Sequence, residues 1–159
     1  MNTVRCVLGM LGTDAHTKGI RTLSRIFRDA GVEVVYLGEH NTYEQFAASV
    51  AAEDADLAGV SFSTAGYVKH VDALMRALDE AGVDDVPVMV GGLIHADDEP
   101  RLRELGVSGI FGPGSTTESI LDFVFSSARS NTEVRSDTEV QTDAHDPTTG
   151  RLVKSQDQV

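Results

Sequence analysis

Residues 4–19, VRCVLGMLGTDAHTKG, start with an apolar run and continue into a loop of small and polar residues. A short, continuous apolar run is typical of a strand that is buried on both faces of a parallel sheet. The same order of an apolar run and an amphipathic stretch repeats along the chain. The expected strands are residues 4–9, 32–37, 57–62, 86–90 and 109–111, and the expected helices are residues 20–30, 43–52, 68–81, 99–105 and 116–125. The pattern therefore predicts five βα units.

Local signals at the ends of the expected helices support this pattern. Thr42 and Gln45 have the spacing of a capping box, and so do Ser115 and Glu118. Glycine adopts the left-handed conformation that ends many helices, and it follows three of the expected ones: Gly31, Gly82 and Gly106. We therefore expect an open, doubly wound α/β domain, flavodoxin-like or Rossmann-like, with a five-stranded parallel sheet covered by helices on both faces.

The composition restricts the class of partner. The chain has 159 residues, 41% of them apolar, which suits one domain with a core. Its net charge of −12 argues against binding to nucleic acid or to an anionic membrane, because both require clustered Lys and Arg. No apolar run approaches the roughly 20 residues that span a bilayer, so we expect a cytoplasmic protein whose partners are small molecules or proteins. The single cysteine, Cys6, lies in an expected strand and is interpreted as a small core residue.

The C-terminal stretch differs in composition from the rest. Residues 129–159 contain no aromatic residue and show no apolar periodicity, so they cannot repay the entropy of ordering. We predict a folded domain at residues 1–128 and a disordered acidic and polar tail at residues 129–159.

Small residues gather where the expected strands end. Residues 12–16, 61–66, 91–93 and 112–114 follow four of the strands and include Gly, Ser, Thr and Ala. In a doubly wound sheet, ligands bind beyond the carboxyl ends of the strands. Small residues there let a large, flat or elongated ligand approach the backbone. These loops therefore favour a sizeable cofactor over a small substrate.

The loop after the first strand carries a histidine and a carboxylate. Asp14 lies two residues before His16, so it can accept a hydrogen bond from one ring nitrogen. A carboxylate in this position orients a metal-bound imidazole and raises its basicity. His16 is thus a candidate metal ligand.

The spacing of three motifs resembles that of cobalamin-binding domains. Asp14-Ala15-His16-Thr17-Lys18-Gly19 is similar to the D-x-H-x-x-G signature of that family. Ser61 follows Gly19 after 41 intervening residues, where the family has the serine of its S-x-L element. Gly91-Gly92 follows Ser63 after 27 residues, where the family has paired glycines. The resemblance covers residues 4–124.

The resemblance implies a role for each motif. In that family the histidine replaces the dimethylbenzimidazole of the cofactor as the lower axial ligand of cobalt, and the displaced nucleotide tail enters a pocket against the sheet. His16 would be the cobalt ligand and Asp14 its hydrogen-bonding partner. The resemblance implies that the cofactor, adenosylcobalamin, also contacts Gly19, Ser61, Ser63, Gly91, Gly92, Gly112 and Gly114. Gly19 would let the helix begin beside the tail, and Ser61 would hydrogen-bond its benzimidazole end.

Two positions depart from the family pattern. Ser63 replaces the leucine of S-x-L, which would make that wall of the tail pocket more polar. Met10 stands where acyl-CoA mutases of the family carry a lysine that pairs with the aspartate, and here the chain is closer to the small subunit of glutamate (methylaspartate) mutase. Residues 111–114, FGPG, are more similar to the methylmalonyl-CoA mutase type. The substrate class, an amino acid or an acyl-CoA, stays open at this point.

The resemblance implies the cobalamin-binding small subunit of an adenosylcobalamin-dependent carbon-skeleton mutase. No catalytic residue is expected in this chain, and a large catalytic subunit with a barrel fold would carry the rearrangement. The main alternative is a corrinoid carrier for methyl transfer. Such carriers usually have a helical domain ahead of the histidine loop, whereas only thirteen residues precede Asp14 here.

Two further alternatives are less favoured. A phosphoryl-accepting receiver domain needs an aspartate at the end of the third strand, where this chain has Ser61. A plain metal site would combine His16, Asp14, His40 and His95. That site would leave the motif spacing to chance, so surface or helix-face positions are the preferred interpretation of His40, His70 and His95.

Overall fold

The computed structural model describes residues 3–142, which form one five-stranded sheet. The strands are β1 (Arg5–Gly9), β2 (Glu33–Tyr36), β3 (Leu57–Phe62), β4 (Val88–Gly92) and β5 (Gly109–Phe111). All neighbouring strands are parallel and their order is β2-β1-β3-β4-β5. This is the flavodoxin-like, doubly wound arrangement, so the predicted fold class is confirmed.

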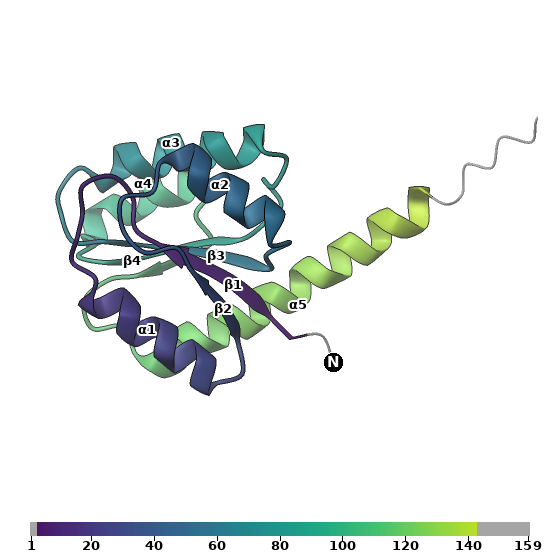
Figure 1. The fold of residues 1–159 in the computed structure, drawn as a ribbon, viewed down its shortest axis with the longest axis horizontal. Helices are drawn as coiled ribbons and strands as arrows, with labels where there is room; N and C mark the ends of the chain where they lie inside the picture. The colour runs from purple at the N-terminus through teal and green to yellow at the C-terminus, as the bar shows by residue number, and fades with distance from the viewer. Residues whose placement is uncertain (1–2, 143–159) are drawn as a thin grey trace, which may run out of the picture.

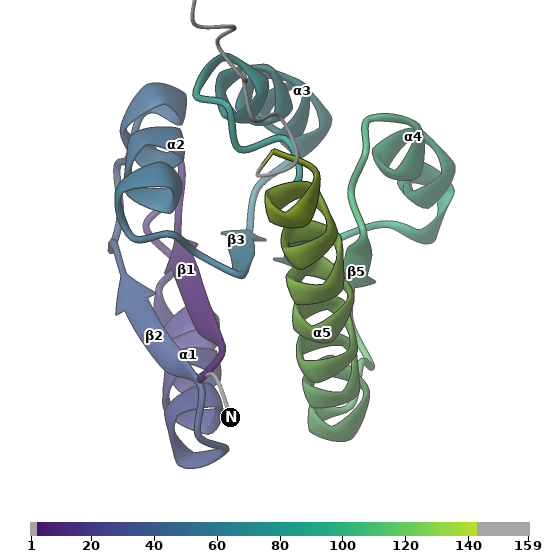
Figure 2. The same ribbon diagram turned by 90° about the vertical axis from the view of Figure 1, so that its right-hand side faces the viewer.

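Helices cover both faces of the sheet. They are α1 (Lys18–Asp29), α2 (Tyr43–Ala52), α3 (Tyr67–Glu80), the 3-10 turn η1 (Ala96–Asp98), α4 (Glu99–Glu104) and α5 (Thr117–Thr142). Figure 1 shows α1 and α5 below the sheet and α2, α3 and α4 above it, and Figure 2 shows the same layers from the side. Within residues 3–142, none of these helices combines the length and the apolar composition needed to cross a bilayer.

A separate apolar cluster lies on each face of the sheet. Phe46 from α2 and Leu74 from α3 are fully buried on one face. Phe27 from α1 and Val124 from α5 are fully buried on the other. Cys6 belongs to this second cluster and has no exposed surface, as expected of a core residue. Burial of large side chains on both faces explains why the strands are apolar along their whole length.

Two of the predicted helix signals are present and one is displaced. Thr42 Oγ1 accepts a hydrogen bond from the N–H of Gln45 at 3.1 Å, and the Gln45 side chain accepts one from the N–H of Thr42 at 3.0 Å. The three glycines predicted to end helices all have positive φ angles: Gly31, Gly82 and Gly106. The prediction for Ser115 is wrong. Thr116 Oγ1 accepts from the N–H of Ser119 at 3.1 Å, because a turn closed by the Ser115 N–H and the Gly112 carbonyl delays the helix by one residue.

The last helix is longer than the sequence pattern predicts. It continues to Thr142, past residue 128, where we expected the folded domain to end. Residues 115–142 contain no Gly or Pro, so no helix-breaking residue ends the helix, although residues 129–142 lack the apolar periodicity of a packed element. The rest of the predicted tail, residues 143–159, lies outside the described residues.

Candidate functional site

The strand order places the site between β1 and β3. The chain leaves β1 toward α1 on one face of the sheet and leaves β3 toward α3 on the other face (Figure 1). Such a reversal opens a crevice beyond the carboxyl ends of the two strands. The loop after β1 contains Asp14 and His16, and the loop after β3 contains Ser63. The structure therefore brings two of the predicted motifs together at the switch point.

Asp14 and His16 form the predicted pair. Oδ1 of Asp14 lies 3.0 Å from Nδ1 of His16 and also accepts a hydrogen bond from the His16 backbone N–H at 3.2 Å. An ionised carboxylate only accepts hydrogen bonds, so Nδ1 carries the proton and the lone pair lies on Nε2. The His16 side chain is 71% exposed, whereas that of Asp14 is 5% exposed. A buried carboxylate thus holds an exposed imidazole whose Nε2 is available to a metal.

The second oxygen of Asp14 is tied to the neighbouring loop. The backbone N–H of Ser63 donates to Oδ2 of Asp14 at 2.6 Å. Burial by itself raises the pKa of Asp14, but the hydrogen bonds from Ser63 and His16 outweigh it, and the pKa lies below its usual range. Asp14 is therefore ionised at neutral pH, as an imidazole-orienting carboxylate must be.

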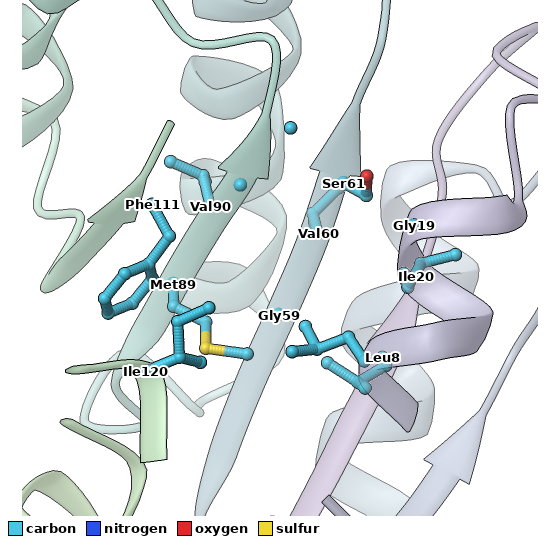
Figure 3. Close-up of a pocket in the computed structure, with 13 residues that line it drawn as sticks. Leu8, Gly19, Ile20, Gly59, Val60, Ser61, Met89, Val90, Phe111 and Ile120 are labelled. Atoms are coloured by element: carbon cyan, nitrogen blue, oxygen red, sulfur yellow. The ribbon is translucent and has the colours of Figure 1, made fainter. Parts of the chain in front are cut away.

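A mostly apolar cavity lies beside this loop, between α1 and α5 and against the sheet (Figure 3). Its volume is about 180 Å³. It is lined by Leu8, Gly19, Ile20, Leu23, Gly59, Val60, Ser61, Met89, Val90, Gly91, Gly92, Phe111 and Ile120. Among these residues only Ser61 has a polar side chain, and Figure 3 shows its hydroxyl on the side of β3 where the labelled Gly19 and Ile20 of α1 lie. The cavity is smaller than the roughly 300–1,000 Å³ typical of sites for a whole drug-sized ligand. It therefore suits one end of a larger molecule.

The predicted glycines around this cavity differ in what they do. A Cβ on Gly19 would meet no atom within 4 Å, so this glycine keeps space open at the start of α1. A Cβ on Gly91 would lie 3.2 Å from the Phe111 carbonyl oxygen. At Gly92, which has a φ of +103°, a Cβ would lie only 2.1 Å from the carbonyl oxygen of Phe62. Gly92 is thus required by the sheet itself, in addition to lining the cavity.

The remaining predicted contacts lie away from this cavity. Ser63 does not line it but borders a second hollow together with Gly66 and Leu93. A Cβ on Gly112 would lie 2.9 Å from the Ile94 carbonyl oxygen, which gives this glycine a packing role. Gly114 has a φ of +89° in the turn before α5.

Sequence reasoning missed Gly59, which lines the cavity in the middle of β3. A Cβ there would lie 2.6 Å from Cδ2 of Leu8 and 2.8 Å from Cε of Met89. These two side chains meet over Gly59 and form the floor of the cavity (Figure 3). A glycine inside an otherwise apolar strand was the available signal, because such a glycine often marks close packing or a ligand.

The other histidines that the structure describes make no metal site with His16. Nδ1 of His40 donates to the carbonyl oxygen of Gly12 at 2.9 Å, and Nδ1 of His70 lies 2.7 Å from the hydroxyl of Tyr43. In the part of the chain that the structure describes, no three His, Cys, Asp or Glu side chains are grouped to hold a metal ion. Among the described residues, His16 is therefore not part of a cluster of metal-binding side chains.

The profile of the B12 binding domain matches residues 4–122. The chain belongs to the B12-binding domain family. It is 32% identical over 123 residues to the 2-hydroxyisobutanoyl-CoA mutase small subunit of Aquincola tertiaricarbonis, covering 77% of this chain and 90% of that subunit. It is 34% identical over 121 residues to the pivalyl-CoA mutase small subunit of Xanthobacter autotrophicus, covering 76% and 81%.

A longer relative and two solved structures place the domain in context. The ethylmalonyl-CoA mutase of Methylorubrum extorquens is 35% identical over 111 residues, which are 70% of this chain but 16% of that enzyme. A cobalamin-binding protein from Desulfitobacterium hafniense has a TM-score of 0.62 at 18% identity, covering 69% of this chain and 53% of that one. The signal receiver domain of Mycobacterium tuberculosis NarL has a TM-score of 0.59 at 19% identity, covering 81% and 98%. At these identities the two structures show a shared fold only.

Proposed function

We propose that this chain is the cobalamin-binding small subunit of an adenosylcobalamin-dependent acyl-CoA mutase. The observation that carries the proposal is the exposed His16 imidazole, which a buried Asp14 holds through Nδ1 and which leaves Nε2 free for cobalt. Family membership and the two mutase small subunits among the relatives support it.

The residues present fit a corrinoid with a displaced nucleotide tail. The tail needs a narrow, mostly apolar slot for an aromatic base, beside the ligating histidine. The cavity between α1 and α5 has this character, and Gly19 leaves open the space that a Cβ would take. Ser61 is the one side chain there able to hydrogen-bond a ring nitrogen. Gly59, Gly91 and Gly92 would let the base lie against the strands.

The residues of this chain would hold and orient the cofactor. His16 would coordinate cobalt through Nε2, and Asp14 would keep the imidazole in the required tautomer and direction. When bound, adenosylcobalamin supplies a weak cobalt–carbon bond that starts radical chemistry. Ser63 would act through its backbone N–H, which keeps Asp14 ionised and in place. Gly112 and Gly114 would contribute to the shape of the turn that borders the nucleotide, rather than to a contact with the base.

An acyl-CoA is the substrate class that the relatives favour over an amino acid. Both small subunits named above, and the longer ethylmalonyl-CoA mutase, are mutases of CoA thioesters. In the longer enzyme the matching region is 16% of the chain, so most of such an enzyme has no counterpart in the matched region. We propose that here a separate large subunit with a barrel fold supplies it and covers the upper face of the cofactor.

A cofactor titration tests the histidine assignment. The full chain, mixed with its large subunit and adenosylcobalamin, is expected to give the absorption spectrum of a corrinoid that has released its own base and bound a histidine. His16→Ala is expected to abolish this spectrum. His95→Ala, which removes an exposed imidazole at the same edge of the sheet, is the matched control and should leave it unchanged. An unchanged spectrum in His16→Ala would contradict the proposal.

A turnover assay tests the substrate class. The same complex is expected to rearrange a branched or linear acyl-CoA and to leave glutamate unchanged. Transfer of a methyl group from the corrinoid, with no rearrangement of any acyl-CoA, would instead support a corrinoid carrier.

A further inference from the structure

The loop that carries Asp14 and His16 is attached to the loop between β2 and α2. The N–H of Gly12 donates to the carbonyl oxygen of Asn41 at 3.1 Å, and the N–H of Asn41 donates to the carbonyl oxygen of Met10 at 3.2 Å. Leu11 and Asn41 form an isolated parallel bridge. The pairing of β1 with β2 therefore resumes beyond the ends of both strands. The functional loop, residues 10–17, which include Asp14 and His16, begins at this point.

The side chain of Asn41 strengthens this attachment. Its Nδ2 donates to the carbonyl oxygen of Met10 at 3.0 Å and to that of Gly38 at 3.0 Å. One amide group thus links the start of the functional loop to the turn after β2. Asn41 is partly buried, which reduces competition from water for these hydrogen bonds.

His40 contacts the next part of the same loop and itself has an unfavourable backbone conformation. Its φ is +60°, which is uncommon for a residue other than glycine and costs free energy. In this conformation Nδ1 donates to the carbonyl oxygen of Gly12 at 2.9 Å. Gly12 lies two residues before Asp14. Its carbonyl oxygen is hydrogen-bonded by His40 and its N–H by Asn41.

The opposite side of the functional loop is held by the loop that follows β3. The Ser63 N–H fixes Oδ2 of Asp14 at 2.6 Å, while Oδ1 holds His16. The segment from Met10 to Asp14 is thus held by the loop after β2 on one side and by the loop after β3 on the other. His16 itself is mostly exposed, so its direction depends on this support.

We infer that His40 and Asn41 are positioning residues that hold the His16 loop ready to ligate cobalt. The inference rests on the proposed function. Neither residue lines the cavity between α1 and α5, so they would act on ligation by His16 and leave the tail pocket intact. Without these hydrogen bonds the loop samples more conformations. Binding of the metal by His16 then costs more conformational entropy, because the loop must become ordered. Removal of a group that hydrogen-bonds a metal ligand directly typically lowers affinity by about 10- to 100-fold, and His40 and Asn41 act one step further away, so we expect the lower end of that range.

Two test variants, one rescue variant and one control variant separate an effect on positioning from an effect on stability. Asn41→Ala removes the amide that links Met10 and Gly38. His40→Gly removes the hydrogen bond to Gly12 but relieves the positive φ, so its thermal stability should equal or exceed that of the wild type. Asn41→Gln keeps the amide and should restore much of the loss. Val107→Ala, which destabilises the core between α4 and β5 away from the loop, is the control for lower stability alone.

The readouts are the affinity for cobalamin and the electron paramagnetic resonance spectrum of the bound Co(II) form. With 15N-labelled histidine in the protein, ligation by a histidine splits each cobalt line of that spectrum into two, whereas the unlabelled base of the cofactor splits each line into three. We refer to the doublet as the split signal, because it reports ligation by His16. We expect Asn41→Ala and His40→Gly each to bind about tenfold more weakly and to show a smaller fraction of the split signal. Val107→Ala should retain the full signal.

Three results would overturn the inference. The first is wild-type affinity with the full split signal in both Asn41→Ala and His40→Gly. The second is a loss of signal in Val107→Ala equal to that in Asn41→Ala at matched stability, because that loss would report stability alone. The third is a wild type whose split signal is absent or persists in His16→Ala, which would also overturn the proposed function and is thereby distinguishable from the first two.

Discussion

The imidazole of His16 and the carboxylate of Asp14 lie 3.0 Å apart, yet one side chain is 71% exposed and the other 5% exposed. The carboxylate is therefore fixed in the protein, and the imidazole extends from it toward solvent. A metal-binding imidazole needs both properties, because one nitrogen must be held and the other must be accessible. The carboxylate is held in turn by a backbone N–H of another loop.

Replacement of Asp14 by Asn should weaken cobalamin binding about 10- to 100-fold. The amide can still accept one hydrogen bond, but it loses the charge that favours the Nδ1–H tautomer of His16. Titration of the full chain with cobalamin, followed by absorption, measures the change. Asp29→Asn, at the exposed end of α1, is the matched control and should bind like the wild type. Equal affinities of the two variants would show that the carboxylate does not orient His16.

Gly19 and Gly92 should respond to alanine in opposite ways. At Gly19 a Cβ meets nothing within 4 Å, and alanine favours the helix, so Gly19→Ala should keep the stability or raise it by up to about 1 kcal/mol. The added methyl group takes space beside the cavity, so cobalamin should bind about tenfold or more weakly, as overpacking costs about 1–3 kcal/mol.

Gly92→Ala is the contrasting variant of this pair. Its Cβ would lie 2.1 Å from the Phe62 carbonyl oxygen at a φ of +103°, so we expect a loss of about 3 kcal/mol or more in the free energy of unfolding. Urea unfolding of both variants measures the stability, and a cobalamin titration of Gly19→Ala measures the binding. A stable Gly92→Ala protein, or a Gly19→Ala protein with wild-type affinity, would contradict these assignments.

The folded domain should end soon after Ala128. Val124 and Ala128 of α5 are buried, and they are the last core residues among those whose side chains are described. A chain that ends after Ser130 should therefore unfold at the same urea concentration as the full chain. A chain that ends after Asp122 loses both buried residues and should be clearly less stable. If the chain that ends after Ser130 were less stable than the full chain, the boundary of the folded domain would lie closer to Thr142.

The fold and the loop that carries Asp14 and His16 were largely predictable from the sequence. Apolar runs and helix-end glycines are local signals, and they located all five strands and their order of βα units. The pairing of Asp14 with His16 was also local, because only two residues separate them. The family resemblance assigned Ser61 and Gly91 to contacts with the nucleotide tail, which stays a prediction, and the structure shows that both residues line the cavity between α1 and α5.

The features that the sequence did not reveal depend on contacts between distant segments. The links from Asn41 and His40 to the functional loop join atoms about 30 positions apart and require both the strand register and the positive φ of His40. Ser63 was assigned to the tail pocket from its place in a motif, whereas its backbone N–H holds Asp14. Side-chain type carries no signal for a contact made by the backbone. The extension of α5 follows helix propensity, because residues 129–142 lack the apolar periodicity that marks the packed helices.

Tyr67 should make the stability of the domain depend on pH in the alkaline range. Its hydroxyl donates to Oδ2 of Asp98 and accepts from the N–H of His95 at 2.9 Å, which joins the start of α3 to the segment after β4. Burial raises the pKa of Tyr67, and the hydrogen bond to the Asp98 carboxylate raises it further. Tyr67→Phe leaves Asp98 and His95 without this partner, so at pH 7 it should lower the free energy of unfolding by about 2 kcal/mol.

The difference between wild type and Tyr67→Phe should shrink as the pH rises above about 10, the ordinary pKa of tyrosine. There the unfolded chain begins to lose the Tyr67 proton while the folded chain keeps it, because the folded pKa is higher. The unfolded state then binds fewer protons than the folded state, so the stability falls with increasing pH. The contribution of Tyr67 is complete below its unfolded pKa and disappears as the pH passes its folded pKa. Urea unfolding of both proteins between pH 7 and pH 11 measures this, and a constant difference across that range would show that Tyr67 ionises equally in both states.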